Sequence, residues 1–105
     1  MTRFNVNDVT DAISQSNTIF NVVLAPNVEA EVTIPEHATY AIFTATSDFW
    51  VKINAIAAIT VPAATDTTHT SSNPELNPLV RMVTEGSIIS LISPSAASVS
   101  IAFYS

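Results

Sequence analysis

The two histidines are the residues of this chain best suited to acid–base chemistry. His37 follows Pro35-Glu36 in a turn-like stretch, and His69 lies in a loop rich in Thr and Ser. A hydrolytic triad holds a histidine between a nucleophile and a carboxylate, and neither histidine has a nucleophile elbow or a partner at a suitable spacing. The single glycine, Gly86, leaves no glycine-rich loop to cradle a phosphate. We therefore expect two solvent-exposed histidines, no catalytic residue and no enzymatic activity.

A polar loop over residues 65–78 contains oxygen ligands of the kind that calcium binds. His69 in the same loop would suit a transition metal. The spacing matches no known calcium loop, and Asp and Asn are also the commonest residues of turns. We therefore favour a structural loop without a metal or another cofactor. Its oxygen donors are Asp66, Asn73, Glu75 and Asn77.

Three aromatic side chains have the shape to stack on a sugar ring, namely Tyr40, Trp50 and Tyr104. Trp50 alternates with Lys52 and Asn54, and such polar neighbours allow partial exposure. The other interpretation is that Trp50 packs in the core or in a subunit contact, with its indole N–H bonded to a carbonyl. We favour the second interpretation, and we take Trp50 and Tyr104 as candidate interaction residues.

The composition is poor in charge but ordinary in apolar content. Of 105 residues, 11% are charged and 48% are apolar, whereas about 25% charged is usual in soluble domains. A small monomer normally uses charged side chains to keep its surface solvated and apart from its neighbours. Their scarcity indicates that other copies or a partner cover much of the surface. The alternative is a monomer with a Thr- and Ser-rich surface.

The net charge of −6 argues against two classes of partner. Only Arg3, Lys52 and Arg81 are cationic, so binding to a nucleic-acid backbone or to anionic lipid has little support. Cysteine is absent, which excludes disulfides and thiolate chemistry. The chain opens without a secretory leader, and its longest apolar run, residues 55–64, is too short to span a bilayer. We expect neither nucleic acid nor membrane as a partner.

Residues 40–53 hold the densest run of β-favouring residues. Ala41 and Phe43 alternate with Tyr40 and Ile42, and a period of two is the mark of a strand. Ser47-Asp48 interrupts the run before a second alternating stretch. We predict a hairpin here, with a continuous strand broken by a bulge as the alternative.

Further strands are predicted on both sides of this centre. Residues 18–24 are almost continuously apolar, as in a strand covered on both faces, whereas residues 28–34 alternate strictly. Residues 55–61 are alanine-rich, but β-branched residues and a following proline favour extended structure there. The remaining strands are predicted at 79–83, 87–92 and 98–104, and Gly86 supplies a turn.

About eight short strands between turn signals predict an all-β fold, namely an antiparallel β-sandwich or a jelly-roll-like barrel. A single domain would span residues 18–105. Residues 1–17 form an N-terminal arm in which Phe4 and Val6 can begin an edge strand. We interpret this arm either as a segment that docks on a neighbouring subunit or as a frayed terminus.

The order of these features resembles the small all-β accessory proteins of tailed bacteriophage virions. The resemblance extends from residue 34 to the C-terminus and is carried by five stretches of sequence. These are the Ile34-Pro35 turn, the strand-rich centre 40–53, the run Val61-Pro62-Ala63-Ala64-Thr65-Asp66 that opens the polar loop, Glu75-Leu76-Asn77-Pro78 that closes it, and the final Ile101-Ala102-Phe103-Tyr104.

This resemblance implies a capsid decoration or cement protein that is made in the host cytoplasm and becomes part of the virion. It implies a homo-oligomer, with a trimer favoured, and the major capsid protein or another virion protein as partner. The interaction candidates are then Phe4, Val6, Trp50 and Tyr104. A head-to-tail or tail-fibre component belongs to the same class, and a carbohydrate-binding or adhesion module is the alternative from another class.

Overall fold

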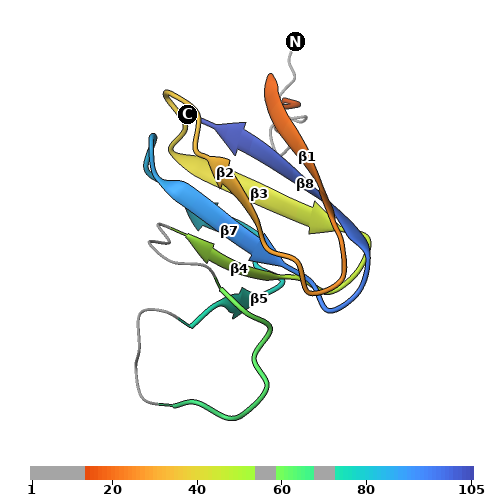
Figure 1. The fold of residues 1–105 in the computed structure, drawn as a ribbon. Coiled ribbons are helices and arrows are strands. Elements are labelled where there is room, and N and C mark those ends of the chain that lie inside the picture. The colour runs from red at the N-terminus through yellow and green to blue at the C-terminus, as the bar shows by residue number, and fades with distance from the viewer. Residues whose placement is uncertain (1–13, 54–58, 68–72) are drawn as a thin grey trace, which may run out of the picture.

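The computed structural model describes residues 14–53, 59–67 and 73–105, and these form two stacked antiparallel sheets of four strands each (Figure 1). No helix occurs in these ranges. In spatial order, sheet 1 contains β1 (Thr18–Leu24), β8 (Ala97–Tyr104), β3 (Tyr40–Ala45) and β6 (Val80–Met82). Sheet 2 contains β2 (Ala30–Thr33), β7 (Ile88–Ile92), β4 (Trp50–Ile53) and β5 (Glu75–Leu76). The predicted all-β sandwich is confirmed.

The strand pairing follows the rule of a jelly roll. β1 pairs with β8, β2 with β7, β3 with β6 and β4 with β5, and every pair is antiparallel. The chain is therefore one long antiparallel hairpin with its tip between β4 and β5. Contacts of β8 with β3 and of β7 with β4 roll this hairpin into two sheets, which is the double-sheet jelly roll.

The core lies between the sheets and is built from alternate residues of their strands. Phe43, Val51 and Leu91 are buried there, and Phe43 packs on Phe49 with ring centroids 6.2 Å apart. In β8 the inward residues Val99, Ile101 and Phe103 are buried. The outward residues of β8 are partly or fully exposed. A two-residue period thus selects the core side of each long strand.

The predicted hairpin over residues 40–53 is wrong, because its two halves belong to different sheets. Side-chain bonds hold the crossing segment between β3 and β4. The Ser93 hydroxyl donates to the Asp48 carbonyl at 2.7 Å, and the Ser47 and Ser95 hydroxyls lie 3.0 Å apart. The alternation located both strands, but their partners come from distant parts of the chain.

The prediction that residues 18–24 are covered on both faces is also wrong for the described protein. β1 is an edge strand whose side chains alternate between partly buried and exposed, and Val23 is 79% exposed. Its apolar run reflects an inner face in the core and an outer face that no other described element covers.

The turns predicted at His37 and Gly86 are confirmed and a similar turn ends β1, and each of the three has a residue in the left-handed region where the turn requires one. Asn27 (φ 58°) follows Pro26, and the Val28 N–H donates to the Ala25 carbonyl at 3.2 Å. His37 (φ 70°) and Gly86 (φ 82°) hold the same position in their own turns. This is the third position of a type II turn, where Gly and Asn are preferred.

The polar stretch 65–78 is not entirely a loop, because β5 lies inside it. A strand of two residues has no alternation to detect. Residues 59–67 run away from the two sheets (Figure 1), and residues 59–61 are neither helix nor strand. The rest of the predicted extended segment 55–61, and most of the N-terminal arm, lie outside the described residues.

Candidate interaction surface

The outward side of sheet 1 is a broad surface without a charged side chain, which we call the neutral face. The strand register defines it, because residues directly opposite on neighbouring strands share a face. It consists of Ile19, Asn21 and Val23 of β1, Ser98, Ser100, Ala102 and Tyr104 of β8, Tyr40, Ile42 and Thr44 of β3, and Val80 and Met82 of β6.

Apolar and aromatic residues form two rows across this face. In one row Ile19 is opposite Ala102, which is opposite Ile42, which is opposite Val80. In the next row Tyr40 and Tyr104 stack with ring centroids 5.2 Å apart and planes 11° from parallel, and Met82 lies beyond Tyr40. Each row therefore joins residues of neighbouring strands that are far apart in the sequence.

Several of these apolar side chains are exposed to solvent. Met82 is 83% exposed and Val80 is 43% exposed. The opposite end of the face has a shallow hollow of about 430 Å³ lined by Val23, Asn21, Thr44 and Ser100 among others. Exposed apolar side chains gathered on one sheet are typical of a surface that meets another protein.

The acidic groups of the described residues all lie elsewhere. Glu29 and Glu31 belong to the region of β2, Glu36 and Glu85 lie in turns, and Asp48 lies where the chain crosses between the sheets. Asp66 lies in the connection between β4 and β5, and Glu75 is the first residue of β5. In a chain of net charge −6, the described residues thus leave one side free of carboxylates, which lowers the electrostatic cost of an apolar contact there.

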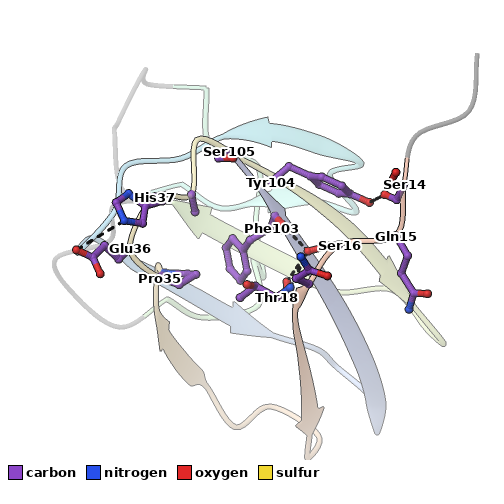
Figure 2. Close-up of a pocket in the computed structure, with 12 residues that line it drawn as sticks. Ser14, Gln15, Ser16, Thr18, Pro35, Glu36, His37, Phe103, Tyr104 and Ser105 are labelled. Atoms are coloured by element: carbon purple, nitrogen blue, oxygen red, sulfur yellow. Dashed lines mark hydrogen bonds and ion pairs between the residues drawn. The ribbon is translucent and has the colours of Figure 1, made fainter. Parts of the chain in front are cut away.

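A separate cavity of about 380 Å³ lies beside the start of β1 and the end of β8 (Figure 2). Two bonds tie the segment before β1 to it. The Ser16 hydroxyl donates to the Phe103 carbonyl, and the Tyr104 hydroxyl donates to the Ser14 carbonyl at 2.9 Å. Ser16 also accepts a hydrogen bond from the Thr18 N–H at 2.9 Å. These bonds position the chain that leads into sheet 1.

Glu36 and His37 line this cavity together with the Tyr104 phenol. The Glu36 and His37 side chains are 78% and 81% exposed and lie 3.9 Å apart, on the side away from Ser16 (Figure 2). The His37 N–H donates to the Glu85 carboxylate at 2.9 Å, and the Ala38 N–H donates to the Pro35 carbonyl at 3.3 Å within this turn. Nucleophile, base and orienting acid are therefore not in reach of one another among the groups that line the cavity.

An ion pair joins the open edges of the two sheets. Arg81 of β6 donates from Nε to Glu75 Oε1 at 2.9 Å and also contacts Oε2 of that carboxylate through Nη2. The hydrogen bond from Arg81 holds the pKa of Glu75 below its ordinary value, and the carboxylate raises the pKa of Arg81. Both side chains are nearly half exposed, so solvent weakens the attraction.

The oxygen donors of the polar loop do not converge on one point. Glu75 binds Arg81. Asn77 binds the segment that leads into β4: its Oδ1 accepts from the Phe49 N–H and its Nδ2 donates to Asp48 Oδ1, both at 3.0 Å. Asp66 and Asn73 line a different hollow of about 260 Å³. Within ranges 14–53, 59–67 and 73–105, no three His, Asp or Glu residues are placed to share a metal ion.

Of the four predicted interaction residues, the structure describes Trp50 and Tyr104, and it does not bring these two together. Tyr104 lies on the neutral face, whereas Trp50 is half-buried on the outer side of sheet 2, opposite Ile92 and Leu76. The two aromatics thus lie on opposite sides of the sandwich. Phe4 and Val6 lie outside the described residues.

Sequence reasoning missed three side chains that position the surface, namely Ser16, Asn77 and Ser93. Ser93 is fully buried and bonds Asp48, and Asn77 occupies the left-handed region at φ 49°. The Asn77-Pro78 dipeptide is a turn signal, so the sequence indicates a turn at Asn77 but not the hydrogen bonds of its side chain. The other two are serines in a serine-rich chain, where nothing local marks their distant partners.

Comparison of the chain with protein families, with curated proteins and with solved structures found no match. In the part of the chain that the structure describes, no helix is long and apolar enough to cross a membrane.

Proposed function

We propose that this protein is a structural component of a bacteriophage virion, most simply a decoration or cement protein that attaches to the capsid and stabilises the shell. The observation that carries the proposal is the neutral face, which combines exposed apolar side chains with the absence of charge. Attachment through this face would account for the low charge of the whole chain. Multiple copies on one shell would bind with the advantage of multivalency.

The fold is compatible with this role, since jelly rolls build viral capsid domains and lectins alike. Fold alone does not choose between these functions. The carbohydrate-binding alternative would combine Trp50 and Tyr104 in one groove, and the structure places them on different sheets. The virion role needs only a surface that excludes water against a partner, and the neutral face has that character.

The proposal can be tested by co-sedimentation of the protein with shells assembled from the capsid genes of the same genome. Val80→Lys introduces a charge into the neutral face. We expect it to weaken attachment at least about tenfold, because the ammonium group must be desolvated in the contact. Val80 is exposed, so the free energy of unfolding should change by no more than about 0.5 kcal/mol.

Leu76→Lys is the matched control. Leu76 is 45% exposed, as Val80 is 43% exposed, but it lies on the edge strand of sheet 2. This variant should co-sediment as the unmodified protein does. Equal attachment of both variants, or no attachment of the unmodified protein, would refute the proposal.

A further inference from the structure

β1 is an edge strand without a device against pairing with another strand. It is seven residues long and contains neither a charged residue nor a proline. The other three edge strands of the described sandwich are shorter and each carries a charge: Glu31 in β2, Glu75 in β5 and Arg81 in β6. Short length and charge are the means by which natural edge strands avoid pairing. Within the described residues, no strand pairs with the outer edge of β1, which is therefore open to an added strand.

The neighbouring ladder shows which backbone groups face this edge. The Thr46 N–H donates to the Ser98 carbonyl at 3.1 Å, so the backbone groups of Ser98 face β3. Orientation alternates along a strand, so those of Val99 face β1 and its partner Val22. The N–H and C=O groups of Ile19, Asn21 and Val23 then point away from β8, towards the free edge.

The side chains of β1 are also incompletely covered. Val23 is 79% exposed on the neutral face. Phe20 and Val22 pack against the core but remain only partly buried at the open side of the sandwich. A strand added to this edge would cover both sets of side chains at once.

We propose that β1 pairs with β1 of a second copy, antiparallel about a two-fold axis through Asn21. In this register Asn21 is opposite its own counterpart and can exchange amide hydrogen bonds with it. Ile19 is opposite Val23 of the other copy on the outer face, and Phe20 is opposite Val22 on the core side. The strand is thus self-complementary in shape and polarity, and about six backbone hydrogen bonds would form.

Because β1 carries no charged side chain, its edge suits a second copy of this chain better than a charged partner. Two chains of net charge −6 repel one another over most orientations, but this pairing joins segments that carry no carboxylate. The same operation on β2 would bring the Glu31 carboxylates of two copies into one patch. Among the described edges, β1 is the one at which self-pairing has no electrostatic cost of this kind.

The contact is small and two-fold. Seven residues at about 3.4 Å each span roughly 24 Å, so the area covered is below the ~800 Å² per partner of a typical stable complex. The dimer should therefore form at high protein concentration. Antiparallel pairing of identical strands is a two-fold contact, so the trimer implied by the resemblance would need another surface.

The absence of cysteine makes a disulfide cross-link a clean test. Asn21→Cys places two thiols opposite one another, within the Cα separation that a disulfide accepts. Under mild oxidation it should form a covalent dimer at least roughly tenfold faster than Thr33→Cys, because pairing raises the effective thiol concentration. Thr33 is an exposed residue of the β2 edge and serves as the control.

Val23→Lys in the Asn21→Cys chain should slow the cross-link towards the rate of the control, because it places a charge opposite Ile19 of the other copy. Sedimentation of the unmodified chain should show a monomer–dimer equilibrium. Cross-linking of Asn21→Cys no faster than that of Thr33→Cys, with or without association by sedimentation, would overturn the pairing. The proposed function does not rest on this contact: slow cross-linking of Asn21→Cys would overturn the pairing alone, and loss of co-sedimentation with shells would overturn the proposed function alone.

Discussion

Two buried serines show how differently the same side chain can act in this sandwich. Ser93 and Ser90 are both 0% exposed. The Ser93 hydroxyl donates to the Asp48 carbonyl and accepts from the Ser95 N–H at 3.2 Å, so it satisfies the segment that crosses between the sheets. The Ser90 hydroxyl, between Glu31 and Lys52 in the register, has no hydrogen-bond partner within the described part of the chain. Burial without a bond costs free energy.

Alanine substitution should therefore have opposite effects at these two positions. Ser93→Ala leaves the Asp48 carbonyl without its donor and should lower the free energy of unfolding by about 1–2 kcal/mol. Ser90→Ala removes an unpaired hydroxyl and should leave the stability unchanged or raise it by up to about 1 kcal/mol. Urea unfolding followed by Trp50 fluorescence measures both, and a larger loss for Ser90→Ala would contradict this assignment.

Turn residues could be predicted because their chemistry is local. Pro26-Asn27 and Gly86 are recognisable within four residues of sequence, and both turns are present. The bonds of Ser93 and Asn77 join positions 45 and 28 apart. No local pattern specifies such partners, so the residues that hold the crossing of the sheets were not foreseen.

At the level of elements, the open side between β5 and β6 is closed by a side-chain pair rather than by a backbone ladder. β5 and β6 are short and belong to different sheets. Glu75 is opposite the inward residue Val51, and Arg81 is opposite the inward residue Ala41. Both side chains therefore start on the inner side of an edge and meet across it.

This pair predicts a pH dependence. The folded-state pKa of Glu75 lies below its ordinary value of 4.5, so its contribution to stability is present above that value and is lost as the pH falls through the folded pKa. The stability difference between the unmodified protein and Glu75→Gln should be small, because the pair is half exposed, and should shrink from pH 6 to pH 3. Urea titrations at several pH values measure this difference.

Glu31→Gln removes the same charge from an exposed position of β2 without an ion pair in the described chain, and so controls for net charge. A difference for Glu75→Gln that grows as the pH falls would contradict the role of the pair.

The strands and their inner faces were predictable, whereas their partners were not. Alternation in residues 40–53 located β3 and β4 and put Ala41 and Phe43 on one face, which is the buried face in the structure. It carries no information on whether the chain reverses within a sheet or crosses to the other one, and the hairpin prediction failed at that point. β5 is too short to show a period at all.

For the whole molecule, the jelly-roll pairing brings the first and last strands together and so creates the neutral face. β1 pairs with β8 along the full length of β1, and Tyr104 stacks on Tyr40 across a separation of 64 positions that no local pattern specifies. The sequence shows that the outward residues of β3 and β8 lack charge. Only the register shows that they form one continuous surface with β6.

The account rests on the neutral face being the side that meets another virion protein. Electron cryomicroscopy of particles assembled from the same genome tests this most directly. We predict density for the jelly roll at the surface of the shell, with the outer side of sheet 1, including Val80 and Met82, turned towards the capsid. Particles that lack the protein, or that hold it with sheet 1 turned to solvent, would contradict the account.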